Sequence, residues 1–183
     1  KERDWPEIEK AHAAKITLLD KQVGRLVRKL KEIGVLDNTL ILFTSDNGPH
    51  YAKGGHDLEF FNSNGNLKGG KRDLYEGGIR VPLIAYWENK IRPESFSYHL
   101  SSFQDIIPTF SEIIGYKVPK NLDGISFLPT LISKDQPKHD YLNWLHMKST
   151  YVRIGSWNVS CTNNTDVPTT QDELNTKIDN IIN

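Results

Sequence analysis

The longest periodic pattern in the chain is helical and lies near the N-terminus. Apolar residues recur there at alternating steps of three and four: Ile16, Leu19, Val23, Leu26, Leu30 and Ile33. Such steps place the residues on one face of a helix. Pro6 fits the first turn of a helix and Gly34 fits its C-terminal cap. The pattern predicts one helix over residues 1–34, with an apolar stripe that packs on a neighbour and charges that stay in solvent; the narrow stripe also fits a coiled coil.

Two uninterrupted apolar runs follow, at residues 39–44 and 80–87. Runs of this kind are typical of strands that are covered on both faces in a parallel sheet. A helix is predicted over residues 103–114, with Pro108 near its start and Gly115 at its end. The order of these elements predicts an α/β fold with helices layered on a sheet. We expect the two strands to be neighbours, the first helix to lie on a face of their sheet, and part of the apolar surface to be left uncovered.

The pattern changes after residue 115. Residues 141–144 and 151–159 are predicted strands of a smaller element, and residues 163–183 form a polar tail. The sequence therefore predicts two units. Residues 1–115 belong to the α/β domain, and residues 116–183 form a small C-terminal α+β element with its tail.

The two apolar runs are separated by a long segment at residues 45–78. It has 34 residues and contains eight of the chain's 13 glycines. Loops of that length inside a domain are usually functional or disordered, and glycine lets a backbone approach a ligand closely. The segment is therefore a candidate binding loop, with His50 and His56 as candidate ligand contacts. A mobile surface loop with solvated histidines is the alternative. The other four histidines have no partner pattern, and His12 is expected to be exposed.

Asp46 and Asn47 come directly after the first strand, where ligands bind in open α/β sheets. Their oxygens suit Ca²⁺ or Mg²⁺, although Ser-Asp-Asn-Gly also makes a simple turn. Lys71 lies among glycines and offers a compact positive charge to an oxyanion such as phosphate or sulfate. The glycine spacing is not that of a P-loop, so nucleotide binding is not indicated.

Charge and composition narrow the function further. The 183 residues include 23 basic and 23 acidic ones, and a zero net charge argues against bulk binding to nucleic acid or an anionic membrane. No stretch approaches the roughly 20 apolar residues of a membrane span. Cys161 is the single cysteine, which excludes an internal disulfide and a multi-cysteine zinc site. The charged first residues lack the character of a signal peptide, so the chain is expected to start within a longer protein or to have been processed.

Several separated motifs together resemble the sulfatase family of the alkaline-phosphatase-like superfamily. They are Ser45-Asp46-Asn47-Gly48-Pro49 and the stretch Lys71-Arg72-Asp73-Leu74-Tyr75-Glu76-Gly77-Gly78-Ile79-Arg80-Val81-Pro82. The second resembles a family signature that contains Tyr-Glu-Gly-Gly. Segments that begin at Leu19, Asp105 and Asp123 are similar to further family segments, in the family order. The resemblance covers about residues 6 to 145.

The resemblance implies hydrolysis of sulfate esters. The family uses a formylglycine hydrate, made from a cysteine or serine, and a divalent cation that is usually Ca²⁺, with Mg²⁺ as the alternative. Asp46 and Asn47 match metal ligands, and Lys71 matches a catalytic lysine that contacts the sulfate. The chemistry agrees, because fixed cations at a reacting sulfuryl group lower the barrier. His50 and His56 would contact the sugar or the sulfate.

The departures from the family pattern are as informative as the matches. The nucleophile motif Cys/Ser-x-Pro-x-Arg is absent, since Cys161 has neither the proline nor the arginine. The aspartate pair that completes the metal site is also absent. The chain therefore looks like the C-terminal part of a sulfatase, without the formylglycine, and is expected to be inactive alone. A non-catalytic truncated sulfatase-like domain is the alternative, and a phosphodiesterase or phosphatase relative is a third reading.

The family resemblance also implies partners and a compartment. The expected partners are a sulfated small molecule or glycan and the N-terminal half of the catalytic domain, with self-association as another way to cover apolar surface. A periplasmic or secreted location is expected for the family. Tyr75, Glu76 and Arg80 are interpreted as a scaffold that holds Lys71 in place.

Overall fold

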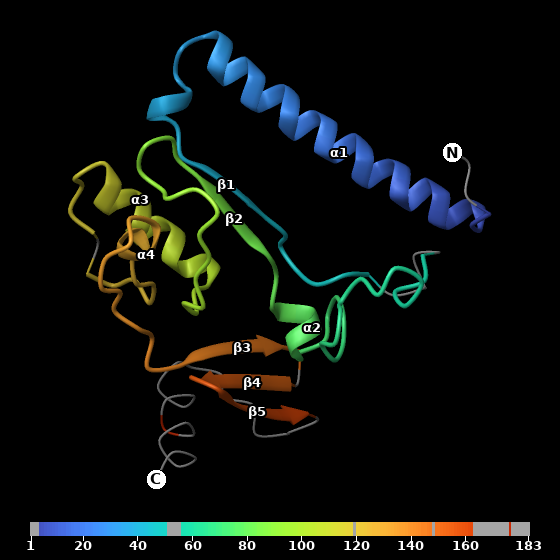
Figure 1. Ribbon diagram of the computed structural model, residues 1–183. Helices are drawn as coiled ribbons and strands as arrows, with labels where there is room; N and C mark the ends of the chain where they lie inside the picture. The colour runs from blue at the N-terminus through green and yellow to red at the C-terminus, as the bar shows by residue number, and fades with distance from the viewer. Residues whose placement is uncertain (1–3, 51–55, 119, 148, 163–175, 177–183) are drawn as a thin grey trace.

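The computed structural model describes residues 4–50, 56–118, 120–147, 149–162 and residue 176, and Figure 1 shows the arrangement of the elements. The polar tail expected at 163–183 lies outside these residues, except for residue 176. The helices are α1 (Glu7–Glu32), η1 (Leu36–Asn38), α2 (Glu76–Ile79), η3 (Phe103–Asp105), α3 (Ile106–Ile113) and α4 (Leu128–Leu131). The strands are β1 (Ile41–Thr44), β2 (Leu83–Tyr86), β3 (Leu142–His146), β4 (Ser149–Ile154) and β5 (Trp157–Thr162).

Helix α1 begins after Pro6 and ends as the sequence predicts. Gly34 has a φ of +71°, in the left-handed region that glycine adopts without strain. Its N–H donates to Lys31 O, and the N–H of Val35 donates to Leu30 O, both at 3.1 Å. These two bonds form a Schellman motif, which satisfies carbonyls at the end of the helix. The predicted helix and its glycine cap are therefore confirmed.

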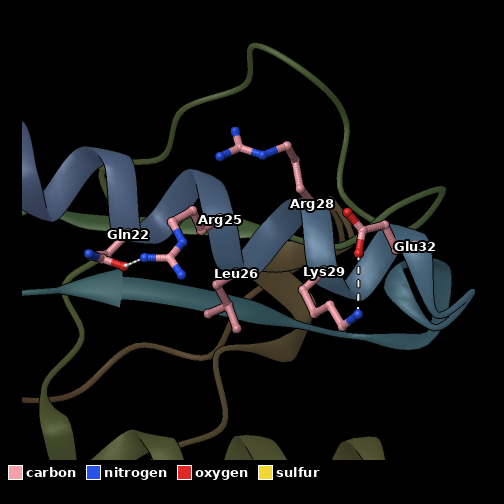
Figure 2. Close-up of a pocket in the computed structure, with 6 residues that line it drawn as sticks. All are labelled: Gln22, Arg25, Leu26, Arg28, Lys29 and Glu32. Carbon is pink, nitrogen blue, oxygen red and sulfur yellow. Dashed lines mark hydrogen bonds and ion pairs between the residues drawn. The ribbon is translucent and has the colours of Figure 1, made fainter.

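The apolar stripe of α1 is not covered by the sheet. The helix runs beside β1 in Figures 1 and 2, but Ile16, Leu19 and Leu26 are 55%, 50% and 55% exposed. The expectation that the helix packs on a face of the sheet is therefore wrong for this chain. A 26-residue helix is about 39 Å long, whereas a four-residue strand spans about 13 Å. A pair of such strands offers too little apolar surface to cover the stripe.

The first two strands are neighbours, as predicted, but they run in opposite directions. Ile41 pairs with Tyr86 and Thr44 pairs with Leu83 in an antiparallel ladder. The expectation of strands covered on both faces is wrong here, since Phe43 is 36% exposed and Ile84 is 61% exposed. A continuous apolar run does not encode the direction of its neighbour. The chain returns alongside β1 only after α2, and β2 then runs in the opposite direction to β1 (Figure 1).

The three C-terminal strands form a separate antiparallel sheet in the order β3-β4-β5. The strand expected at 151–159 is in fact two strands, because Ile154 pairs with Trp157 across a two-residue turn. Gly155 has a φ of +56° in that turn, as tight hairpins require. Cys161 lies in β5, at the edge of this sheet. Tyr151 of β4 is 1% exposed and is among the most buried side chains described.

Helix α3 is joined to the segment after it through the buried carboxylate of Asp105. This carboxylate is fully buried and accepts hydrogen bonds from the N–H groups of Ser102 and Ile125, both at 2.8 Å. The Thr109 hydroxyl accepts from the N–H of Phe127 at 2.9 Å. Two segments that resemble separate family motifs, at 105–109 and 123–126, are therefore in direct contact.

None of the helices in the described part of the chain combines the length and the apolar character needed to cross a bilayer. Helix α1 is long enough, but it carries a charged face along most of its length.

Candidate active site

The turn that follows β1 presents two oxygen-bearing side chains. Asp46 and Asn47 lie directly beyond the strand, with Asp46 exposed and Asn47 partly buried. The Ser45 hydroxyl donates to Asn47 O at 2.8 Å and closes the turn from within. A carboxylate and an amide therefore follow the carboxyl end of a strand, and their oxygens are of the kind that a hard cation prefers.

Two backbone hydrogen bonds join this turn to the glycine-rich segment that carries Lys71. The N–H of Gly48 donates to Gly78 O at 2.8 Å, and the N–H of Lys71 donates to Pro49 O at 2.8 Å. The structure thus brings the backbone of Lys71 beside the turn of Asp46, although 25 positions separate the two residues in the sequence. This places the two predicted parts of the site in one loop cluster at one end of β1.

The contact between the two segments requires glycine. A Cβ atom on Gly48 would lie 1.8 Å from Gly77 O, and one on Gly77 would lie 2.1 Å from Gly69 O. No side chain fits at such distances, and the obstructing atoms are backbone atoms that cannot move aside easily. The glycines of this segment therefore serve backbone packing against backbone, which is the physical reason for their density.

Lys71 stands in a tight turn. The N–H of Gly70 donates to Asp73 Oδ2 at 3.0 Å, and the N–H of Asp73 donates back to Gly70 O at 2.9 Å. Arg72, between them, has a φ of +79°, a conformation that costs energy for a residue with a side chain. A turn closed on both sides in this way holds the Lys71 backbone in one conformation.

The second half of the segment is tied to the C-terminal sheet through Glu76. Its carboxylate accepts hydrogen bonds from the Tyr151 hydroxyl at 2.7 Å and from Arg153 Nη1 at 2.5 Å. Arg80 lies one helical turn further along, with its Nη1 atom 3.7 Å from Glu76 Oε2. The scaffold role expected of Tyr75, Glu76 and Arg80 stays a prediction, and Tyr151 and Arg153 were not found from the sequence as partners of Glu76. They lie 75 and 77 positions beyond Glu76, and no local pattern connects them.

This contact changes the ionisation of its members. Burial raises the pKa of Glu76, but the hydrogen bonds from Tyr151 and Arg153 and the positive charge of Arg153 outweigh it, so the net pKa lies below its usual value. Burial and the adjacent Glu76 carboxylate raise the pKa of the Tyr151 hydroxyl. Glu76 is therefore ionised and Tyr151 is neutral at neutral pH, which is the state in which the hydroxyl donates to the carboxylate.

His56 contacts the first helix. Its Nδ1 atom lies 2.6 Å from Glu9 Oε2, and the N–H of Asp57 donates to Glu9 Oε1 at 2.8 Å. Glu9 is 2% exposed. The ring of His12, which was expected to be exposed, stacks on the His56 ring at 3.8 Å between centroids. His50 lies exposed near the start of the loop, so the structure gives the two loop histidines different surroundings.

A second histidine–carboxylate contact lies outside the loop. His139 Nε2 lies 2.8 Å from Asp105 Oδ1, and the side chain of His139 is 7% exposed. Burial lowers the pKa of the nearby His99, against the opposing effect of the Asp105 charge. The sequence showed no partner for either histidine, because the contact joins positions 34 residues apart. This cluster fastens the region after α3 and has no link to the predicted metal ligands.

The chain resembles known proteins over most of its length. The family model described as Sulfatase matches residues 4–116. The mouse (Mus musculus) steryl-sulfatase is 31% identical over 151 residues, which cover 80% of this chain and 24% of that protein. The chain belongs to the sulfatase family. It spans about a quarter of the length of the curated relatives it matches.

Solved structures of sulfatase-family relatives agree in fold. A crystal structure of Ps i-CgsB in complex with k-i-k-neocarrahexaose has a TM-score of 0.66 at 35% identity, and the match covers 79% of this chain and 32% of that one. A structure of another protein, in complex with its substrate D-glucosamine-2-N,6-O-disulfate, has a TM-score of 0.66 at 28% identity over 84% of this chain and 31% of that one. The α/β, alkaline-phosphatase-like assignment is therefore confirmed.

Asp46 and Asn47 do not by themselves make up a metal site. Among the described residues, no group of three or more histidine, cysteine, aspartate or glutamate side chains is placed to hold a metal ion. Asp46 and Asn47 supply hard oxygen donors of the kind that Ca²⁺ and Mg²⁺ prefer, but Ca²⁺ takes six to eight oxygens. The two residues fit a divalent cation as contributors, and further ligands are needed to complete its shell.

Proposed function

We propose that this chain supplies part of the active site of a sulfuric ester hydrolase that acts on sulfated glycans. The proposal is supported most directly by the two backbone hydrogen bonds that join the Asp46 turn to the Lys71 segment. They bring a candidate cation site and a candidate sulfate-contacting lysine into one loop cluster. Membership of the sulfatase family supplies the reaction class, and the sulfated sugar D-glucosamine-2-N,6-O-disulfate bound by a relative supports the substrate class.

In this proposal each residue has one task. Asp46 and Asn47 hold a divalent cation, Ca²⁺ or alternatively Mg²⁺, through their side-chain oxygens. When bound, the cation stabilises negative charge on the sulfate group. Lys71 adds a compact ammonium charge at a sulfate oxygen, and fixed charges aimed at developing charge are among the largest contributions to catalysis. The contacts of Glu76 with β4 keep the segment of Lys71 in place.

The loop histidines are assigned to the sugar. We propose that His50 hydrogen-bonds to a sugar hydroxyl or to the sulfate. His56 is a candidate for the same role through Nε2, because its Nδ1 already faces Glu9. Nε2 of His56 is buried and has no hydrogen-bond partner among the described residues.

The nucleophile has to come from outside these 183 residues. The sequence holds no Cys/Ser-x-Pro-x-Arg motif, so the formylglycine and the other metal ligands would be supplied by an N-terminal half of the catalytic domain. Loss of a covalent nucleophile costs several orders of magnitude in rate. We therefore propose that the chain by itself releases no sulfate, that residues 1–115 complete the catalytic domain, and that residues 116–183 are a C-terminal element. A periplasmic or secreted location belongs to the same proposal.

Two measurements test the assignment on a longer protein that contains this chain and the nucleophile motif. Lys71→Ala should lower kcat for a sulfated oligosaccharide by about 10²- to 10³-fold. Lys90→Ala, at an exposed lysine outside the loop, is the matched control and should leave kcat unchanged. Asp46→Ala should weaken Ca²⁺ binding measured by calorimetry. The matched control, Asp135→Ala, changes an exposed aspartate outside the loop and should leave Ca²⁺ binding unchanged.

The same experiments can contradict the proposal. Full turnover in the Lys71→Ala variant would remove the lysine from the reaction. Unchanged Ca²⁺ affinity in the Asp46→Ala variant would remove the metal ligand. Robust sulfate release by the 183-residue chain alone would mean that the mechanism does not use the family's nucleophile. If no form of the protein that contains the motif releases sulfate, the chain belongs to a non-catalytic sulfatase-like protein.

A further inference from the structure

One face of the C-terminal half of α1 is strongly basic. Between residues 21 and 31 the helix carries five cationic side chains and no acidic one, and all five are exposed. They are Lys21, Arg25, Arg28, Lys29 and Lys31. The three that stand closest together around the helix axis, Lys21, Arg25 and Arg28, are called the basic stripe below.

The basic stripe lies opposite the apolar stripe of the same helix. At about 100° per residue, Lys21, Arg25 and Arg28 fall within an arc of about 60°, whereas Leu26 and Leu30 project from the other side. Figure 2 shows Arg28 pointing away from β1, whereas the side chains of Arg25 and Leu26 extend on the side of β1.

Among the described residues, no ion pair neutralises the charges of the basic stripe. Arg25 donates to the neutral Gln22 Oε1 at 3.1 Å. Lys29 pairs with Glu32 at 3.3 Å, but neither Lys21 nor Arg28 forms an ion pair with a described residue. Two members of the basic stripe, Arg25 and Arg28, line an open hollow of about 460 Å³ together with Gln22, Leu26, Lys29 and Glu32 (Figure 2). This part of the helix surface offers positive charge and room for a ligand.

We propose that the basic stripe binds a sulfated polysaccharide at a site separate from the candidate active site. Three cations spread over a rise of about 10 Å along the helix match a polymer that repeats its sulfate groups along a strand. The two guanidinium groups can each pair with a sulfate through two parallel N–H donors. The choice of a sulfated glycan over nucleic acid rests on the proposed function, since both polymers are polyanions that the same charges would attract.

Binding of heparin to the 183-residue chain, measured by calorimetry or fluorescence at about 0.1 M salt, tests the proposal. Replacing Lys21, Arg25 and Arg28 together by glutamine should weaken heparin binding about tenfold or more, because three exposed charge contacts are lost. The matched control replaces Lys15, Lys90 and Lys134, all exposed, by glutamine. It removes the same net charge and should weaken binding less than about twofold. Desulfated heparin should not bind measurably to the unsubstituted chain or to either variant.

A second variant and a second polyanion complete the test. Glu32→Gln removes the acidic residue beside the hollow and should tighten heparin binding, an outcome that misfolding cannot produce. The proposal would be overturned if the basic-stripe variant and its control lost heparin affinity equally, or if neither set of substitutions changed heparin affinity. Binding of a single-stranded DNA as tight as that of heparin would overturn the choice of ligand. The readout involves no turnover, so its failure is distinct from a failure of the proposed hydrolase activity.

Discussion

The contact between Glu76 and the C-terminal sheet makes a specific prediction about stability. Tyr151→Phe removes one hydroxyl and keeps the ring, which is 1% exposed and packs at 5.7 Å from the Trp144 ring. The variant leaves Glu76, whose side chain is 19% exposed, without one of its donors. A hydrogen bond to a charged group contributes about 1.5–3 kcal/mol, and partial access to water reduces the loss to about 1–2 kcal/mol.

This loss is large enough to measure. For a chain of this size it corresponds to a fall in Tm of about 3 to 6 °C, followed by circular dichroism, and to a lower urea midpoint. Tyr98→Phe is the matched control, because Tyr98 is 85% exposed and its substitution should change stability by less than about 0.5 kcal/mol. Glu76→Gln combined with Tyr151→Phe should give a coupling of about 1 kcal/mol in a double-mutant cycle.

The result can refute the reasoning in two ways. Equal stability of the Tyr151→Phe and Tyr98→Phe variants would mean that the hydroxyl makes no net contribution. Additive effects of the Tyr151 and Glu76 substitutions would mean that the two side chains do not stabilise each other. Either result would mean that the contact of Glu76 with Tyr151 does not stabilise the packing of the C-terminal sheet on the segment that carries Lys71.

Two further predictions concern glycine packing and pH. Gly48→Ala should destabilise the chain by about 3 kcal/mol or prevent folding, since its Cβ would overlap Gly77 O. Gly24→Ala, in the interior of α1, should instead stabilise the chain by about 0.5–1 kcal/mol. Urea unfolding of both variants measures the difference, and equal effects would contradict the backbone contact. Burial lowers the folded-state pKa of His99 below its usual 6.5, so the unfolded chain binds the proton more readily and the free energy of unfolding should be highest above pH 6.5 and fall as the pH drops through the lower folded pKa. His99→Gln should flatten that dependence in unfolding curves at several pH values, His146→Gln serves as control, and an unchanged slope in His99→Gln would exclude the effect.

Local patterns determined a large part of this protein. The spacing of apolar residues and Gly34 were sufficient to predict α1 and its end, because helix periodicity and caps involve residues only a few positions apart. The motifs around Asp46 and Lys71 identified the family for the same reason. The residue types in these motifs meet local backbone requirements, namely a turn after a strand and glycines where two backbones are in contact.

Tertiary structure alone decided the direction of β2, the exposure of the α1 stripe and the partners of the buried charges. The direction depends on the path of the connection between residues 45 and 82, and an apolar run is the same in either direction. The contacts of Glu76 with Tyr151, of Asp105 with His139 and of Glu9 with His56 join residues that are 34 to 75 positions apart. Each contact forms because burial penalises an unpaired charge, and which partner meets it is set only once the chain has folded.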